Sequence, residues 1–413
     1  MVPYILSVTL LLWMTLCIII KLQFPFWNIQ PVYHQYDLWR FLYTTPFIVH
    51  KQKPWKTKYV DQQQVFTFSK ENLSQKQINY LLQLLQGYTV PEDQNVIYNI
   101  NEKQLTSMFR EHQHECYVSF YYRQTPVPSE TTLSFHNIHY QQAPIATMYS
   151  FPVVLNVLPS RSGTQYTQLS IPFHSHPINK HEEDLTISRT LFQTHNYNYI
   201  ERHPKEKVSM FKKQGALHNG IIPIVEWYSY TYYIGQLPPM QQFDDITMTN
   251  IHTNNHTLLE QTFTNQCVSG SPKQFSLWVT THFSHILHQI KEEELYVYML
   301  HQNMRPLAFY FFKKSPMEYE EPEGKTMELV ASINLQQSLE IFYKGFLQGL
   351  HNVRKANKNH KYIIIQQSSH NTLLFPLWNQ QYQYIQRDQQ AYYLFNYIVP
   401  QSPFASSSTF ILL

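Results

Sequence analysis

The order in which strand-like and helix-like segments alternate along the chain constrains its fold more than any single motif does. Runs rich in aromatic and β-branched residues predict strands at 117–122, 145–157, 165–173, 221–234, 295–300, 307–312, 362–366 and 392–399. Apolar residues at helical spacing predict helices at 77–86, 184–195, 258–264, 275–289 and 339–353. Each half of the chain runs helix, strands, helix, strand. This order predicts an α/β fold, with a mixed sheet and helices on its faces.

The chain begins with an almost continuous apolar run at residues 5–20, closed by Lys21. Its length is at the lower limit for a helix that spans a bilayer, and no Lys or Arg precedes it as in a cleaved signal peptide. We expect residues 1–22 to form a retained transmembrane or signal-anchor helix; a cleaved signal and a buried core helix are the alternatives. Basic residues after the run, from Lys21 to Lys58, favour a cytosolic main domain. The sequence thus predicts a membrane-anchored protein.

The rest of the chain is long enough for two domain-sized units. Pro238 and Pro239 stand in a linker between the two series of predicted elements. We therefore expect two halves, at residues 23–237 and 238–413.

Composition excludes several classes of function. The chain has 31 Lys and Arg against 28 Asp and Glu, a net charge of +3, which gives no argument for a nucleic-acid partner. It has nine glycines and neither GxGxxG nor GxxxxGK[ST], so a phosphate site must be built without a glycine-rich loop. His282, His285 and His288 repeat at three-residue spacing, but no HExxH and no neighbouring Cys accompany them, so we predict no metal site.

Two motifs stand near the ends of the chain. Phe26-Trp27-Asn28-Ile29-Gln30-Pro31-Val32 follows the apolar run, and Tyr392-Tyr393-Leu394-Phe395-Asn396-Tyr397 precedes a tail that we expect to be irregular and that ends at Leu413. The pair resembles N-myristoyltransferase, a family that transfers a fatty acyl group from acyl-CoA to the N-terminal glycine of proteins. The resemblance implies two GNAT-like acyltransferase halves related by a pseudo-twofold axis. It also implies that the terminal carboxylate, on Leu413, is the catalytic base.

The resemblance assigns residues to the acyl-CoA site. In the family, the opening motif helps to hold acyl-CoA, which implies roles for Phe26, Trp27, Asn28 and Gln30. Two backbone amides at the end of a strand polarise the thioester carbonyl. They correspond here to Ser170 and Ile171, or, one residue further, to a register that includes Pro172, which has no N–H group to donate.

The basic turn that holds the CoA phosphates in the family is altered. Only Lys180 and His181 remain of its cations, together with His174 and His176 upstream, and 182–184 is acidic. An acidic first turn suits a helix dipole but not a ligand with several phosphates. Myristoyl-CoA remains the implied co-substrate, with no prosthetic group.

The resemblance also implies an acceptor site for peptides with an N-terminal glycine. Glu92 and Asp93 resemble an acidic loop that lines the peptide groove, although Pro-Glu-Asp more commonly forms a solvated turn before a strand. Asn371, Asp388 and Tyr393 match positions near the acceptor. His218 stands in place of a threonine that steers the glycine amine; it relays a proton or simply fills a lost catalytic position.

Three functions are therefore considered. The first is direct acyl transfer, in which the Leu413 carboxylate deprotonates the glycine ammonium and the amine attacks the thioester. The second is an inactive protein with the same fold that binds an acyl group or a peptide N-terminus. The third is an acyltransferase of the same broad superfamily that uses another donor.

Overall fold

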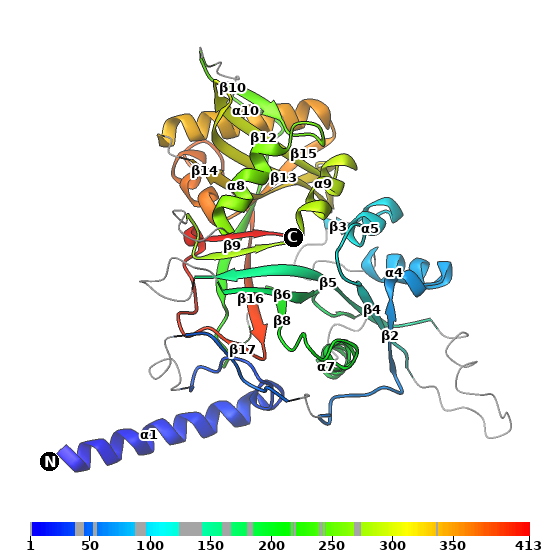
Figure 1. The fold of residues 1–413 in the computed structure, drawn as a ribbon, viewed down its shortest axis with the longest axis vertical. Coiled ribbons are helices and arrows are strands. Elements are labelled where there is room, and N and C mark those ends of the chain that lie inside the picture. The colour runs from blue at the N-terminus through cyan, green and yellow to red at the C-terminus, as the bar shows by residue number, and fades with distance from the viewer. Residues whose placement is uncertain are drawn as a thin grey trace.

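One large mixed sheet organises the protein (Figure 1). The computed structural model describes residues 2–37, 45–52, 56–86, 96–123, 143–158, 167–179, 185–215, 218, 220–238, 243, 245–267, 274–335 and 338–413. Within them, 16 strands form a continuous sheet whose main path runs β10-β12-β13-β14-β15-β9-β16-β8-β6-β5-β11-β18, and β1 pairs separately with β17. The predicted fold class, a mixed sheet with helices on its faces, is confirmed.

The strands are contributed by both halves of the chain. Those of the first half are β1 (Phe47–Ile48), β2 (Val65–Ser69), β3 (Val96–Tyr98), β4 (Tyr117–Tyr121), β5 (Ala146–Val157), β6 (Thr167–His174), β7 (Ile178–Asn179), β8 (Ser209–Gln214) and β9 (Val225–Tyr233). Those of the second half are β10 (Thr247–Asn250), β11 (Leu277–Thr280), β12 (Leu295–Gln302), β13 (Arg305–Tyr319), β14 (Gly324–Asn334), β15 (His360–Gln366), β16 (Tyr384–Phe395), β17 (Tyr397–Ile398) and β18 (Thr409–Leu412).

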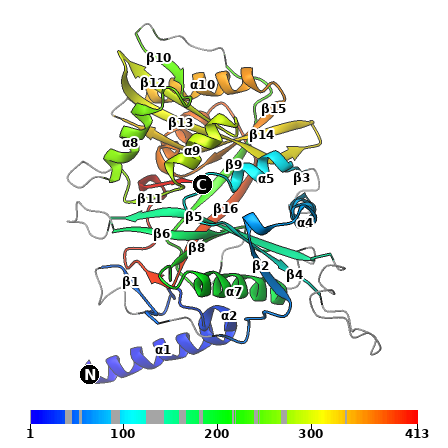
Figure 2. The ribbon, with the colours of Figure 1, turned by 45° about the vertical axis from the view of Figure 1, so that its right-hand side comes forward.

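Helices cover the faces of the sheet, as Figure 2 shows for α7 below it and α8, α9 and α10 around its upper part. The helices are α1 (Val2–Gln23), α2 (Pro25–Asn28), α4 (Gln75–Gln86), α5 (Glu102–Met108), α7 (Leu185–Arg202), α8 (Thr257–Cys267), α9 (Phe283–Lys291), α10 (Leu339–Ala356) and α11 (Phe375–Trp378). The described residues also form the 3₁₀ turns η1 (Lys70–Asn72), η2 (Ser369–Leu373) and η3 (Ser406–Ser408).

Strands from one half of the chain lie next to or between strands from the other half within the sheet. β9, from the first half, lies between β15 and β16 of the second half, and β11 and β18 extend the sheet beyond β5 of the first half. Hydrogen-bonded sheet therefore continues across the predicted boundary at residue 237. The boundary itself stays a prediction.

Two predicted segments differ from the structure. The single helix expected at 275–289 is the strand β11 followed by the helix α9. Four apolar residues of a buried strand cannot be told from a helical turn by their pattern, and here the neighbours β5 and β18 decide in favour of the strand. The tail expected to be irregular ends in β18, which pairs in parallel with β11.

The prediction of a membrane anchor is wrong. Residues 5–20 lie in α1, which projects from the body of the protein in Figure 1. Among the described residues, no helix combines the length and the apolar character that crossing a bilayer requires. Membrane association through residues 5–20 has no support from the structure.

The end of the chain is anchored by aromatic packing. Phe410 of β18 stacks on Trp278 of β11 with ring centroids 4.1 Å apart, and both side chains are buried. Phe263, Phe275 and Phe311 contact this pair with ring centroids 5.0–5.9 Å from one of its two rings. This cluster fixes the position of β18, and therefore of the last residue of the chain.

Candidate active site

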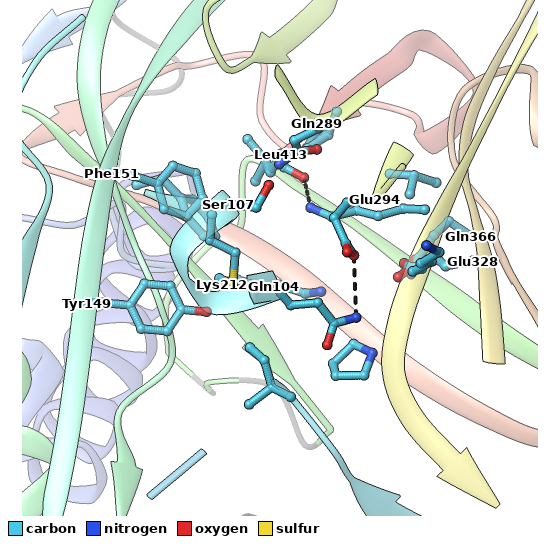
Figure 3. A pocket seen from close by; sticks show the side chains of 18 of the residues that line it. Gln104, Ser107, Tyr149, Phe151, Lys212, Gln289, Glu294, Glu328, Gln366 and Leu413 are labelled. Atoms are coloured by element: carbon cyan, nitrogen blue, oxygen red, sulfur yellow. Dashed lines mark hydrogen bonds between the residues drawn. The ribbon is translucent and has the colours of Figure 1, made fainter. Parts of the chain in front are cut away.

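The chain ends in the interior of the protein, beside a cavity. Figure 1 places the C-terminus at the centre of the molecule. A cavity of about 250 Å³ opens at Leu413. Its walls carry aromatic side chains from Tyr98, Tyr149, Phe151, Phe173, Trp227 and Tyr392, and charged side chains from Lys212, Glu294, Lys313, Lys314 and Glu328. The cavity is therefore largely apolar, with a few charges at defined places (Figure 3).

A lysine holds the terminal residue. The ammonium of Lys313, on β13, donates a hydrogen bond of 2.6 Å to the terminal oxygen of Leu413. Burial lowers the pKa of Lys313, and the negative charges of Glu328 and Glu294 oppose this shift. The interaction fixes the terminal carboxyl group at the edge of the cavity and favours its ionised form.

A hydrogen-bonded chain orients the carboxylate of Glu328. The indole of Trp227 donates to Oε1 of Gln366 over 2.6 Å, and the amide of Gln366 donates in turn to Glu328. Three neighbouring strands, β9, β15 and β14, supply these residues. Glu328 is therefore a fixed negative charge on the cavity wall opposite Lys212 (Figure 3).

Successive side chains of the central strands β8 and β16 point to opposite faces of the sheet and line two separate sites. On β8, Lys212 enters the cavity, whereas Phe211 packs in a separate aromatic cluster. On β16, Tyr392 lines the cavity and Tyr393 joins that same cluster. Successive strand residues point to opposite faces, so the cluster lies behind the sheet as seen from the cavity.

The opening motif forms this second site. Trp27, which follows Phe26 in α2, stacks on Phe211 with centroids 5.5 Å apart and an interplanar angle of 4°. The ring of His218 lies 4.5 Å from that of Trp27, and its backbone N–H donates to the hydroxyl of Tyr393 over 3.3 Å. The motif thus contributes a half-buried aromatic surface behind the sheet.

Cationic side chains gather around this aromatic surface. Burial, together with the nearby groups Lys213, His176 and Arg189, lowers the pKa of His218 to about 3. Lys213 lies at the end of β8, and Arg189 in the second turn of α7. Positive groups from separate elements therefore meet beside the start of α7, where an anion would find both these charges and the helix dipole. Such an anion would raise the pKa of His218.

The two motifs at the ends of the chain touch each other. The backbone N–H of Asn396 donates to the carbonyl of Pro31 over 2.6 Å. The side-chain amide of Asn396 donates to the carbonyls of His50 and Lys207. Asn396 has φ of 62°, a conformation that asparagine tolerates better than most residues. The asparagine of the second motif thus joins it to the first.

The strand β6 presents one of the two amides expected to polarise a thioester. Pro172 lies directly opposite Pro152 of β5, and since neither has an N–H group, this is a non-hydrogen-bonded pair of the antiparallel ladder. Alternation then directs the N–H of Ile171 toward β5 and that of Ser170 away from it. β6 and β8 pair only at Phe173 and His174. On the side of β6 that faces β8, the backbone N–H of Ser170 is therefore available to a ligand, whereas Pro172 has no N–H group to offer.

A histidine pair supports the cavity wall. His112, after α5, stacks on His285 of α9 with ring centroids 4.0 Å apart. His285 Nδ1 lies 2.7 Å from the carbonyl of Arg110, and its Nε2 lies 2.7 Å from the amide of Gln289, which lines the cavity. Within the described part of the chain, no three His, Cys, Asp or Glu side chains are placed to hold a metal ion.

This pair predicts acid sensitivity. Burial lowers the pKa of His112 from 6.5 to about 4 and that of His285 to about 3. The unfolded chain therefore binds more protons between pH 6.5 and 4, so the free energy of unfolding falls as the pH falls through this window. We expect the substitution His112→Gln to flatten this slope by about 1.4 kcal/mol per pH unit at most. Urea midpoints measured across the window check this, with His252→Gln, at an exposed position, as the control. Equal slopes in both variants would contradict the prediction.

Comparison with known proteins adds a likeness of fold. No protein-family model matches the sequence, and no curated protein matches it in sequence. A solved structure of Saccharomyces cerevisiae N-myristoyltransferase with bound myristoyl-CoA and inhibitors superposes with a TM-score of 0.68 and 12% identity, covering 94% of this chain and 96% of that one. The chain has the fold of N-myristoyltransferase. A second structure of the yeast enzyme, with bound myristoyl-CoA, gives a TM-score of 0.64 at 12% identity, with 91% of this chain and 87% of that chain covered.

Several predicted site residues lie away from the cavity at Leu413. Asn371 is buried in η2, where its amide donates to the carbonyls of Leu329 and Gln366. Asp388, on β16, accepts from Gln386 over 3.3 Å and is not part of the cavity lining. Tyr393 faces the opposite side of the sheet. Their roles at an acceptor site stay predictions.

Other predicted residues belong to the aromatic surface or fall outside the described structure. Oδ1 of Asn28 accepts from the hydroxyl of Tyr36 over 3.1 Å, and Gln30 is buried beneath a neighbouring hollow. The predicted residues outside the described ranges are Glu92, Asp93, Lys180 and His181.

Sequence reasoning missed several charged residues near both sites. These residues are Arg189, Lys212, Lys213, Lys313 and Glu328. The adjacent pair Lys212-Lys213, within a strand, is the one available signal, because alternation places two such charges on opposite faces. Which face each would serve depends on the sheet around them.

Proposed function

We propose that the protein transfers a fatty acyl group from acyl-CoA to the amine of an acceptor, with myristoyl-CoA as donor and a glycine N-terminus as acceptor. The observation that carries this proposal is the last residue of the chain, which ends beside a largely apolar cavity. A cationic and aromatic surface lies behind the same strands. The likeness of fold to yeast N-myristoyltransferase, solved with myristoyl-CoA, supports the donor.

The donor would approach from the face that carries α7. Its phosphates would meet Lys213 and Arg189, and the aromatic surface around Trp27 would hold the apolar part. The thioester would reach the cavity between β6 and β8, beyond their paired residues Phe173 and His174. There the backbone amide of Ser170 would donate to the carbonyl oxygen of the thioester.

The acceptor would enter the cavity as an ammonium. The carboxylate of Leu413 takes one proton from it. The free amine then attacks the thioester carbon, so that a C–N bond forms, the C–S bond breaks and CoA leaves as a thiol after taking up a proton. An α-carboxylate is a weak base against an amine, and the reaction therefore depends on close presentation in a water-poor site.

The first experiment measures thiol release. The full chain is mixed with myristoyl-CoA, with and without a peptide that begins with glycine, and free CoA is followed with a thiol reagent. We expect release that depends on the peptide, together with a peptide whose mass has increased by one acyl group. A folded protein that releases no thiol would refute the transferase.

A second function, binding without transfer, has its own support. The regular ladder of β6 turns only one of the two expected amides toward the gap, and removing one oxyanion donor costs about 10²–10³ in rate in a well-studied enzyme. The ammonium of Lys313 is also hydrogen-bonded to the terminal carboxyl of Leu413, which is the group that should accept the proton. Tight binding of myristoyl-CoA without thiol release would identify this alternative.

The proposed donor site makes a specific prediction. We expect Lys213→Met to weaken CoA binding about 10- to 100-fold, because one charge-assisted contact to a phosphate is worth about 1.5–3 kcal/mol. Calorimetric titration with CoA measures this. Lys325→Met removes an exposed lysine that pairs with Glu318 on the surface and serves as the matched control. Equal CoA affinities of the two variants would show that the phosphates do not bind at Lys213.

A further inference from the structure

The ammonium of Lys212 lies in the cavity without a hydrogen-bonding partner among the described residues. Its side chain projects from β8 into the cavity beside Leu413 (Figure 3). The ammonium lies 5.8 Å from the ring centroid of Tyr392. It makes no hydrogen bond and no ion pair with any residue that the structure describes. Lys313, in the same cavity, differs because its ammonium is bound to Leu413.

A charged group that is half-buried and forms no hydrogen bond is energetically unfavourable. Burial lowers the pKa of Lys212, while Glu328 and Asp388 oppose the shift from beyond contact distance. Two anions therefore stabilise the ammonium at long range, but neither satisfies its hydrogen-bonding capacity. A half-buried ammonium beside aromatic rings is stabilised when an anion of a ligand binds to it.

Among the charged groups on the cavity wall, the terminal carboxyl of Leu413 and the ammonium of Lys212 have opposite signs. The terminal carboxyl of Leu413 suits a ligand ammonium, and Lys212 suits a ligand anion. The volume of about 250 Å³ is below the usual range for drug-sized ligands. Both groups lie on the wall of this one small cavity, so an acceptor that meets both carries an amine and an anion.

We propose that the acceptor has a carboxylate close to its reacting amine, and that Lys212 binds this carboxylate. The inference rests on the proposed acyl transfer and narrows its acceptor. Two sources supply this chemistry: an acidic side chain directly after an N-terminal glycine, or the carboxylate of a free amino acid. Lys212 is then a specificity-determining residue that aligns the amine with Leu413.

Matched acceptors test the proposal. The peptides Gly-Asp-Ala-Ala-amide and Gly-Asn-Ala-Ala-amide differ only in one carboxylate, as do free glycine and glycinamide. We expect kcat/KM for the wild type to be about 10- to 100-fold higher for the carboxylate member of at least one pair, the range for a charge-assisted hydrogen bond. Preference for Gly-Asp identifies the peptide source, and preference for glycine over glycinamide identifies the free amino acid.

Variants at Lys212 connect the preference to the residue. We expect Lys212→Met to lower the ratio of kcat/KM between the carboxylate and the amide member of the preferred pair to about 1. Lys212→Arg should retain part of the preference, since it keeps the charge. Lys325→Met, outside the cavity, controls for total charge. Thermal midpoints show whether each variant is folded, and Lys212→Gln replaces the methionine variant if that one is not.

Failure of this inference can be distinguished from failure of the proposed function. Equal kcat/KM within both acceptor pairs would overturn the inference and leave acyl transfer intact. A Lys212→Met variant that slows all four acceptors equally would also overturn it and place Lys212 at the transferring carbonyl. If no acceptor is acylated, calorimetric binding of the same four compounds decides: about 10-fold tighter binding of a carboxylate member, lost in Lys212→Met, would support the Lys212 site without transfer. Equal binding would overturn it.

Discussion

A single alanine appended after Leu413 is expected to abolish thiol release. The extension converts the terminal carboxylate into an amide, which accepts no proton, and moves the new carboxylate about 3.3 Å along the strand direction. It also moves the terminal negative charge away from Lys313, whose ammonium binds the terminal oxygen of Leu413 in the unextended chain. Positioned general bases contribute about 10²–10⁴ in rate, and we expect a loss in the upper part of this range.

The matched variant for this extension is Leu413→Ala, which changes the side chain and keeps the carboxylate. We expect it to retain most of the rate of thiol release and the extended chain to lose it, while both bind CoA as the wild type does. An extended chain that keeps more than about a tenth of the wild-type rate would show that Leu413 is not the base. Glu328, held in place by Gln366, would then be the next residue to test.

The sequence predicted those parts of the fold that have a strong local pattern. The helix predicted at 77–86 is part of α4, and the strand predicted at 145–157 nearly coincides with β5. Residues of both end motifs meet at Asn396 and Pro31. The motifs could be recognised because their residues are contiguous, and their contact then follows from the fold.

The parts that could not be predicted depend on partners far away in the sequence. β18 is only Thr409–Leu412, and what makes it a strand is pairing with β11, which itself was expected to be helical. Short apolar segments carry no periodicity of their own, so their neighbours determine their structure. The position of Leu413 beside the cavity follows from this pairing.

The charged residues of the site depend on the sheet in the same way. Lys212 and Lys213 are adjacent in the sequence, yet one enters the cavity and the other belongs to the cationic group near His218. The sequence shows two lysines in a row, but their separate roles require the register of β8 in the sheet. Lys313 lies 100 residues from its partner Leu413, and no local pattern indicates such a pair.

Replacing Phe410 by alanine is expected to cause the largest loss of stability. Phe410 is fully buried against Trp278, and removing a buried aromatic side chain costs about 3–5 kcal/mol. We expect a lower urea midpoint for Phe410→Ala, and little change for Ile385→Ala, whose side chain is 52% exposed on β16.

The same substitution connects stability with the proposed chemistry. β18 lies at one end of the main path of the sheet and pairs with β11 alone, so loss of the Phe410 stack should release this strand before the rest of the sheet unfolds. Thiol release by Phe410→Ala should therefore disappear at a temperature where circular dichroism still reports a folded sheet, because Leu413 has left the cavity. Coincident loss of activity and of the sheet signal would instead show that β18 unfolds only together with the whole protein. Activity and stability would then be inseparable at this strand.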